Sequence, residues 1–84
     1  MSPEQVREVM IEYDASDAYV MDEYSEAFIG ITHNNQAVYD FDKIISILRE
    51  DMSEEEAIEY IYYNIIGSIP SFDNKYPIIL FKEE

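Results

Sequence analysis

The amino-acid sequence predicts a small α+β fold: a three-stranded antiparallel or mixed sheet with about three helices, in the order helix, strand, strand, helix, helix, strand. Apolar residues recur at helical spacing in three segments, and short runs of branched and aromatic residues lie between turn formers. With 84 residues the chain has room for one domain, 1–84. A hydrophobic content of 48%, including 14% aromatic residues, argues against disorder.

The first predicted helix covers about 3–13. Ser2 can cap it, Pro3 suits its first position and Gln5 completes a capping box. Its apolar face is expected to consist of Val6, Val9, Met10 and Tyr13. The stretch 14–26 has no clean period, so we expect a loop with at most one irregular turn. Residues 1–25 thus form an acidic helix and loop, and residues 26–84 hold the sheet and the other helices.

A β-hairpin is predicted next. The segment 26–32 carries the branched and aromatic residues of a strand, 33–36 supplies turn formers, and 37–39 continues as the second strand. Asp40 can then cap a second helix, which should end near Asp51. Its apolar stripe is Ile44, Ile45, Ile47 and Leu48.

The third predicted helix starts at Glu54, because Ser53 to Glu56 form the clearest capping box in the chain. Gly67 is well placed to end it. Its buried side is expected to hold Ala57, Ile58, Ile61 and Ile65, with Tyr62 as a further candidate. A turn-rich stretch at 69–75 leads to a final strand at 76–81, where Pro77 cannot donate to a ladder and so favours an edge.

The charge narrows the class of partner. The chain has 19 acidic and 5 basic residues, a formal net charge of -14 at pH 7. Binding to nucleic acid or to an anionic membrane relies on cationic side chains that displace counterions from phosphate, so we expect neither without a metal. The favoured partner is a basic protein. The chain lacks cysteine, a long apolar run and a basic signal-peptide start, so we expect a soluble, cytoplasmic protein.

Catalysis is not expected. His33 is the only histidine, it falls in the predicted hairpin turn, and no nucleophile motif accompanies it. Calcium loops beginning at Asp14 or Asp40 lack the glycine required at the sixth position, where Tyr19 and Ile45 stand. With only two glycines there is no phosphate-binding loop. We therefore expect no enzyme activity, no cofactor and no specific metal site; only weak, nonspecific binding of divalent cations fits the pattern.

The candidate partner-binding residues are carboxylates and tyrosines. Glu4, Glu8 and Glu12 are four residues apart, which aligns them on one helix face at about 6 Å per step. Glu55 and Glu59 repeat this spacing on the third helix. The full set is Glu4, Glu8, Glu12, Asp14, Asp17, Asp22, Glu23, Glu26, Glu55, Glu59, Tyr13, Tyr19 and Tyr24. In addition, Tyr60, Tyr62 and Tyr63 cannot all face the core of one helix, so at least one should be exposed.

Part of the chain resembles a group of small bacterial and phage proteins. The matching segments, within about 26–81, are Phe28-Ile29-Gly30-Ile31, Ala37-Val38-Tyr39-Asp40, Met52-Ser53-Glu54-Glu55-Glu56-Ala57, Glu59-Tyr60, Asn64, Gly67 and Pro77-Ile78. The chain departs from the group at Glu50-Asp51, where Asp-Gly is usual, and in the turn 68–76. The resemblance implies the hairpin, helix and strand order, and it implies no activity.

Two interpretations of the acidic residues stay open. In the first, rows of carboxylates imitate the phosphates of duplex DNA, and the size and charge look like those of phage inhibitors of restriction, CRISPR or DNA-repair enzymes. In the second, the charge keeps a small structural or regulatory module in solution, and a tyrosine-rich surface makes the contact, with a homodimer as one form of this alternative. Self-repulsion at this charge costs stability in a small domain, which favours a charge with a function.

Overall fold

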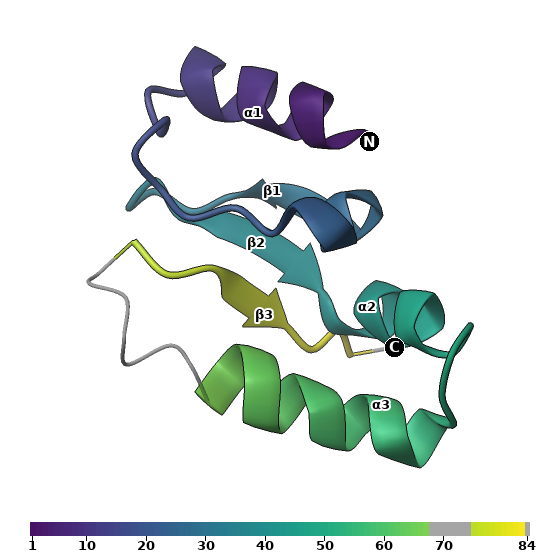
Figure 1. The fold of residues 1–84 in the computed structure, drawn as a ribbon. Coiled ribbons are helices and arrows are strands. Elements are labelled where there is room, and N and C mark those ends of the chain that lie inside the picture. The colour runs from purple at the N-terminus through teal and green to yellow at the C-terminus, as the bar shows by residue number, and fades with distance from the viewer. Residues whose placement is uncertain (68–74, 84) are drawn as a thin grey trace.

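The computed structural model describes residues 1–67 and 75–83 and shows helices packed on a three-stranded sheet (Figure 1). In chain order the elements are α1 (Pro3–Glu12), the 3-10 helix η1 (Asp22–Ala27), β1 (Phe28–Ile31), β2 (Ala37–Asp40), α2 (Phe41–Leu48), α3 (Glu54–Tyr60), the π-helical turn η2 (Ile61–Ile65) and β3 (Ile78–Leu80). The predicted α+β class and element order are confirmed. The turn predicted at 69–75 lies outside the described residues except for Lys75.

The sheet is mixed, with strand order β1-β2-β3. β1 pairs antiparallel with β2 through Ile31 opposite Ala37, and a bulge interrupts the register between Phe28 and Gly30. β2 pairs parallel with β3, with Tyr39 opposite Ile79. A parallel pair needs a long crossover, and α2 and α3 lie within it.

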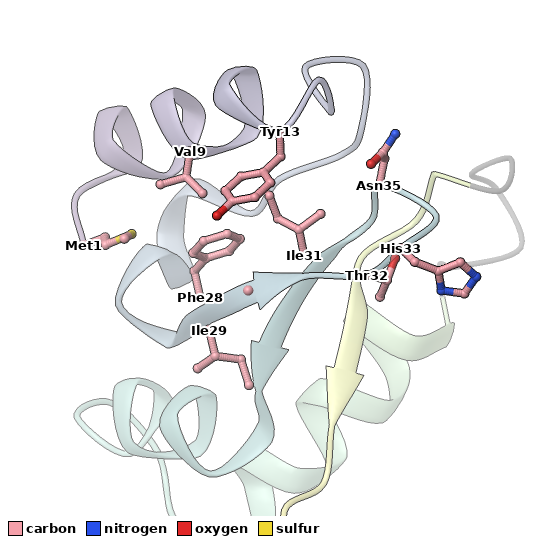
Figure 2. Close-up of a pocket in the computed structure, with 10 residues that line it drawn as sticks. Met1, Val9, Tyr13, Phe28, Ile29, Ile31, Thr32, His33 and Asn35 are labelled. Carbon is pink, nitrogen blue, oxygen red and sulfur yellow. The ribbon is translucent and has the colours of Figure 1, made fainter.

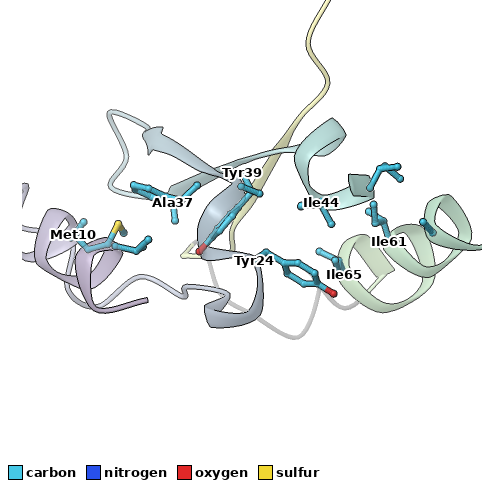
Figure 3. Close-up of a cluster of buried hydrophobic side chains, with 13 residues drawn as sticks. Met10, Tyr24, Ala37, Tyr39, Ile44, Ile61 and Ile65 are labelled. Atoms are coloured by element: carbon cyan, nitrogen blue, oxygen red, sulfur yellow. The ribbon is translucent and has the colours of Figure 1, made fainter. Parts of the chain in front are cut away.

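The helices cover one face of this sheet. Ala37 and Tyr39 on β2 are fully buried and belong to the hydrophobic core, to which Ile79 of β3 also packs. Val38 and Ile78, which point to the opposite face, are half-buried and lie outside that core. Figure 3 shows the buried side chains of the core. They are Val6, Met10, Ala15, Tyr24, Ala27, Phe28, Ala37, Tyr39, Ile44, Ile45, Ala57, Ile61 and Ile65.

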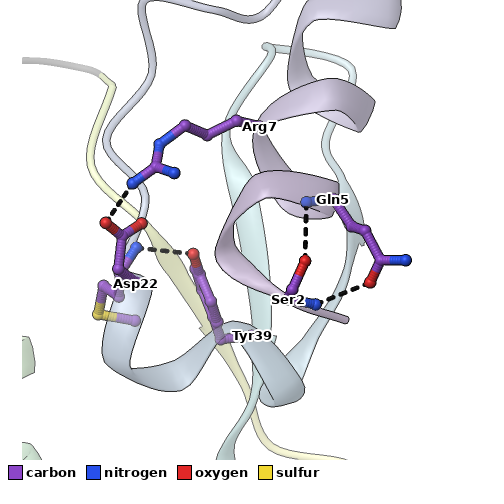
Figure 4. Close-up of polar contacts among 6 residues, drawn as sticks. Ser2, Gln5, Arg7, Asp22 and Tyr39 are labelled. Atoms are coloured by element: carbon purple, nitrogen blue, oxygen red, sulfur yellow. Dashed lines mark hydrogen bonds and ion pairs between the residues drawn. The ribbon is translucent and has the colours of Figure 1, made fainter.

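The predicted start of α1 is confirmed, and its end is corrected. The Ser2 hydroxyl accepts from the Gln5 N–H at 3.2 Å, and the Gln5 side chain accepts from the Ser2 N–H at 2.8 Å (Figure 4). The helix ends at Glu12, and Tyr13 as C-cap is 62% exposed instead of buried. Asp14 follows with a positive φ of 61°, which turns the chain out of the helix.

The irregular turn expected between 14 and 26 is the 3-10 helix η1. The Met21 N–H just before it donates to the Tyr39 hydroxyl at 2.7 Å, which ties η1 to the central strand (Figure 4). At the hairpin, the Thr32 N–H donates to the Gln36 carbonyl at 2.9 Å, and Asn35 takes the left-handed conformation that asparagine tolerates.

The caps of α2 and α3 are those the sequence predicts. Asp40 accepts from the Asp42 N–H at 3.0 Å, and Ser53 and Glu56 form the reciprocal capping box of α3. α2 is shorter than expected, ending at Leu48.

Beyond Tyr60 the helix continues as the π-helical turn η2. The described glycines have no positive φ, so the left-handed cap expected at Gly67 is not used. A Cβ at Gly67 would lie 2.9 Å from the Tyr62 carbonyl oxygen, so the position favours glycine because of this close approach. The prediction of Tyr62 on the buried side is wrong, since it is 49% exposed.

The last strand is shorter than predicted. It begins at Ile78, directly after Pro77, which agrees with a proline that cannot join the ladder. Within residues 1–67 and 75–83, none of the helices has the length and apolar character required to cross a membrane.

Candidate protein-binding surface

The three glutamates of α1 form one exposed row. The helix buries Val6 and Met10, and Glu4, Glu8 and Glu12 lie on the side turned away from them. Among the described residues none of the three glutamates has an ion-pair partner. We call Glu4, Glu8 and Glu12 the acidic row; its carboxylates stand unneutralised in solvent.

The acidic residues between 14 and 26 divide into two groups. Asp22 forms an ion pair with Arg7 of α1 (Figure 4), and Asp17 lies 3.8 Å from the Lys75 ammonium. These two carboxylates therefore help to hold the loop in place and are partly neutralised. Asp14, Glu23 and Glu26 are exposed and, within the described part of the chain, carry no ion pair.

Glu55 and Glu59 stand apart from these residues. They are exposed on α3, and in Figure 1 α3 lies at the opposite end of the molecule from α1, near β3, whereas α1 lies near β1. The structure therefore does not bring all the predicted acidic residues onto one face. It gives two acidic surfaces, one on α1 and one on α3.

The predicted tyrosines have different environments. Tyr13 and Tyr19 are 62% and 49% exposed. The prediction that Tyr24 lies on the binding surface is corrected: it is buried at 6% exposure, because η1 turns it inward to the core. Burial, aided by the neighbouring Tyr60 and Glu23, raises the pKa of Tyr24 to about 12. Tyr24 is therefore a core residue, and only a small part of its side chain is exposed.

The surface of α3 and η2 combines carboxylates with tyrosines. Tyr60, Tyr62 and Tyr63 are 39%, 49% and 81% exposed, so the expectation of at least one exposed tyrosine is exceeded. A shallow depression there is lined by Asp51, Met52, Glu56, Glu59, Tyr60, Tyr63 and Asn64. The signal that could have added these tyrosines to the candidate site is their 100° spacing, which places them around the exposed side of a helix whose Ala57 and Ile61 are buried.

A second feature that the sequence did not predict is a groove of about 640 Å³ between α1 and β1. In Figure 2 Val9 and Tyr13 project from α1 toward Phe28 and Ile31 of β1. Its full lining is Met1, Val9, Tyr13, Phe28, Ile29, Gly30, Ile31, Thr32, His33 and Asn35. We call it the α1–β1 groove; its described lining is mainly apolar and includes neither lysine nor arginine.

Two further carboxylates have structural roles. Asp40 is 5% exposed, caps α2 and lies 3.2 Å from the Lys82 ammonium. Hydrogen bonds from the Ser53 N–H and hydroxyl lower the pKa of Glu56.

Tyr39 on the central strand shows the opposite shift. Burial raises the pKa of its hydroxyl, although the hydrogen bond from the Met21 N–H opposes this.

His33 is exposed in the hairpin turn at one end of the α1–β1 groove. Within the described residues, no group of three or more His, Cys, Asp and Glu side chains is arranged to hold a metal ion.

The chain matches no family model, no curated protein and no solved structure, so the resemblance described above is carried by its own motifs alone.

Proposed function

We propose that this protein is a non-enzymatic, acidic binding protein that occupies the nucleic-acid site of a basic enzyme in place of DNA, as a phage-type inhibitor would. The observation that carries the proposal is the acidic row. Three carboxylates at a repeat of about 6 Å stand on one rigid helix, exposed and unpaired within the described residues. A DNA-binding surface uses lysine and arginine to contact a similar line of phosphates.

The charge supports this function in a second way. Unpaired carboxylates on one element create a negative field that attracts a basic surface and increases the rate of association. Two of the five basic side chains, Arg7 and Lys75, pair with Asp22 and Asp17 and leave the acidic row free. The row therefore keeps its full charge for an external partner.

The test is competition on purified basic enzymes: a restriction endonuclease, a CRISPR nuclease and a uracil-DNA glycosylase. We expect binding to at least one of them, displacement by duplex DNA, and an affinity that falls steeply with salt. The variant Glu4→Gln, Glu8→Gln, Glu12→Gln should weaken binding far more than a control with the same charge change at exposed acids outside the candidate set, Glu50→Gln, Glu54→Gln, Glu83→Gln. An affinity that does not change with salt concentration, or a complex that duplex DNA does not displace, contradicts the proposal.

A second candidate function is a homodimeric interaction module whose charge serves to keep it in solution. The exposed Tyr60, Tyr62 and Tyr63 favour it, because tyrosine gives large contact area with few rotatable bonds. Light scattering on the purified protein separates the two. A stable dimer that Tyr62→Ser and Tyr63→Ser disrupt supports the module, and a monomer at all concentrations contradicts it.

A further inference from the structure

A pocket of about 320 Å³ lies where the loop before η1, the end of α3 and the residue before β3 meet. Its described lining is Tyr19, Val20, Met21, Glu23, Tyr24, Tyr60, Asn64, Ile65 and Pro77. Tyr24 and Ile65, which lie side by side in Figure 3, are buried and form the floor of the pocket. Tyr19 and Tyr60 are 49% and 39% exposed and stand at its mouth. We call it the tyrosine pocket; its volume is within the range of ligand pockets, about 300 to 1,000 Å³.

The lining combines three aromatic rings with one carboxylate. The face of a tyrosine ring carries partial negative charge, and it attracts a cation that lies within about 6 Å of it. Glu23 is exposed and forms no ion pair among the described residues. After burial and the neighbouring Tyr60, its charge is the next cause of the raised pKa of Tyr24, so the carboxylate acts on the floor of the pocket.

The basic side chains that form ion pairs are held by other carboxylates. The described lining of the tyrosine pocket includes neither lysine nor arginine. The Tyr19 N–H donates to the Lys75 carbonyl at 3.1 Å, which places Lys75 beside the pocket, but the Lys75 ammonium lies 3.8 Å from Asp17. Arg7 and Lys82 are paired elsewhere. The negative charge of the pocket is therefore available to an external cation.

We propose that the tyrosine pocket binds the guanidinium group of an arginine side chain that the basic partner presents. The inference rests on the proposed function, since it takes the partner to be a DNA-binding protein, whose DNA-contacting surface uses arginine. A guanidinium is planar, stacks on aromatic rings and is more weakly hydrated than an ammonium, so it enters a largely aromatic and apolar pocket at lower cost. Its five donors can reach both the Glu23 carboxylate and the tyrosine hydroxyls.

The surroundings of the pocket favour an arginine that belongs to a longer basic segment. Tyr60 and Asn64 line both the tyrosine pocket and the shallow depression on α3, and the Asn64 amide donates to the Tyr60 carbonyl at 3.2 Å. The depression is also lined by Asp51, Glu56 and Glu59. A segment whose arginine enters the pocket would therefore have three carboxylates next to it, across Tyr60. A small free cation in the pocket would gain no contact with them.

The experiment titrates the full chain with the peptide acetyl-Lys-Gly-Arg-Gly-Lys-amide and follows the backbone amide shifts by NMR. In three control peptides the arginine is replaced by lysine, by trimethyllysine or by citrulline, which has the shape of arginine without its charge. The small compound acetyl-Arg-amide represents a free guanidinium.

Two pairs of variants test the lining. Glu23→Gln is compared with Glu26→Gln, which removes an exposed carboxylate of η1 outside the lining. Tyr60→Leu is compared with Tyr62→Leu, which removes an exposed tyrosine outside the lining. Each pair makes the same chemical change, so a difference between its members reports on the pocket.

We expect the arginine peptide to bind about three-fold or more tightly than the lysine peptide and about ten-fold or more tightly than the citrulline peptide. Its saturable shifts should centre on Glu23, Tyr60 and Asn64. Glu23→Gln and Tyr60→Leu should each weaken binding about three-fold or more, and their matched controls should weaken it much less.

Three results would overturn the inference. Equal affinities of the arginine and lysine peptides, with equal losses in Glu23→Gln and Glu26→Gln, would reflect only attraction to the net charge. Tighter binding of the trimethyllysine peptide would identify a site for methylated ammonium groups. An affinity of acetyl-Arg-amide equal to that of the arginine peptide would identify a free guanidinium compound as the ligand.

The enzyme panel keeps the inference apart from the function on which it rests. Arginine-specific binding to the pocket, together with failure of the enzyme panel, contradicts DNA mimicry and supports the pocket. Binding to a panel enzyme that Glu23→Gln and Tyr60→Leu leave unchanged overturns the pocket as the arginine site and leaves the acidic row as the contact.

Discussion

The helices α1 and α3 make similar use of acidic residues and differ in what surrounds them. Each begins with a serine capping box, and each carries glutamates four residues apart on its exposed side. On α1 the acidic row stands on the exposed side of a helix whose Val9 and Tyr13 line the apolar α1–β1 groove. On α3 and η2 the glutamates are interleaved with Tyr60, Tyr62 and Tyr63, and Tyr62 stacks on Phe81, which follows the edge strand β3. The number of charges does not distinguish the two surfaces, whereas their neighbours do.

The largest expected effect tests whether the two helices are equally part of the core. Ile61, at the start of η2 directly after α3, is fully buried, and Met10 of α1 is 2% exposed. Either residue changed to alanine should lower the free energy of unfolding by about 2 to 5 kcal/mol, measured by urea denaturation. Tyr63→Ala, at an 81% exposed position, is the control and should change it by less than about 0.5 kcal/mol. A near-zero effect of Met10→Ala alone would mean that α1 is only loosely attached.

The next effect concerns Tyr24 of η1, a core residue whose pKa is raised to about 12, mainly by burial. A tyrosine with a raised folded-state pKa contributes stability below its unfolded pKa and loses that contribution as the pH rises through the folded value. A shift of two units corresponds to about 2 to 3 kcal/mol. We expect stability to fall between about pH 10 and pH 12, and Tyr24→Phe to flatten this fall. Unfolding curves across that range check it; an unchanged pH profile in Tyr24→Phe contradicts it.

The two capping boxes should respond differently to acid. Ser2→Ala and Ser53→Ala should each cost about 0.5 to 2 kcal/mol near neutral pH. The partner of Ser2 is Gln5, which does not titrate, whereas the partner of Ser53 is Glu56, whose pKa is lowered by the Ser53 hydrogen bonds. A lowered carboxyl pKa gives stability above the unfolded value that is lost as the pH falls through the folded value. The cost of Ser53→Ala should therefore shrink at about pH 3, while that of Ser2→Ala stays constant.

The smallest expected effect on stability comes from repulsion between like-charged glutamates on the same helix. Glu8 has like charges four residues away on both sides, at Glu4 and Glu12. Glu59 has one like charge four residues away, Glu55; the Glu56 carboxylate, three residues away, instead accepts from the Ser53 N–H. Each like-charge pair costs about 0.2 to 0.5 kcal/mol. Glu8→Gln should thus stabilise the protein by about 0.4 to 1 kcal/mol, and Glu59→Gln by about half as much. Thermal unfolding at low salt detects the difference, and high salt should remove it; a destabilised Glu8→Gln would mean that Glu8 has a hidden partner.

Local signals predicted most of the fold. The capping boxes at Ser2 and Ser53, the cap at Asp40 and the turn before β2 depend on residues within a few positions of one another, and all of them are confirmed. Helical spacing also identified Val6 and Met10 as buried. It failed for Tyr13, because α1 ends one residue earlier and its last turn extends past the core.

The candidate surface was only partly predictable. Exposure of the acidic residues followed from their charge, and the alignment of Glu4, Glu8 and Glu12 followed from helix geometry. The burial of Tyr24 did not follow, because η1 has no regular period and its orientation is fixed by the contact of Met21 with Tyr39. The α1–β1 groove depends on how α1 packs against a strand that comes later in the chain, and no local sequence pattern encodes the packing of these two elements.

The parallel register of β3 has a consequence for how the sheet assembles. β1 and β2 meet across a short turn, so their pairing closes a small loop, whereas Tyr39 and Ile79 meet only after the whole of α2 and α3 has been placed. Closing the longer loop costs more chain entropy and depends on distant contacts. The hairpin is therefore expected to be the early-forming half of the sheet and β3 the last strand to join. Until β3 arrives, β2 also has a free edge, and the exposed strand pair is the species most prone to pair with other chains.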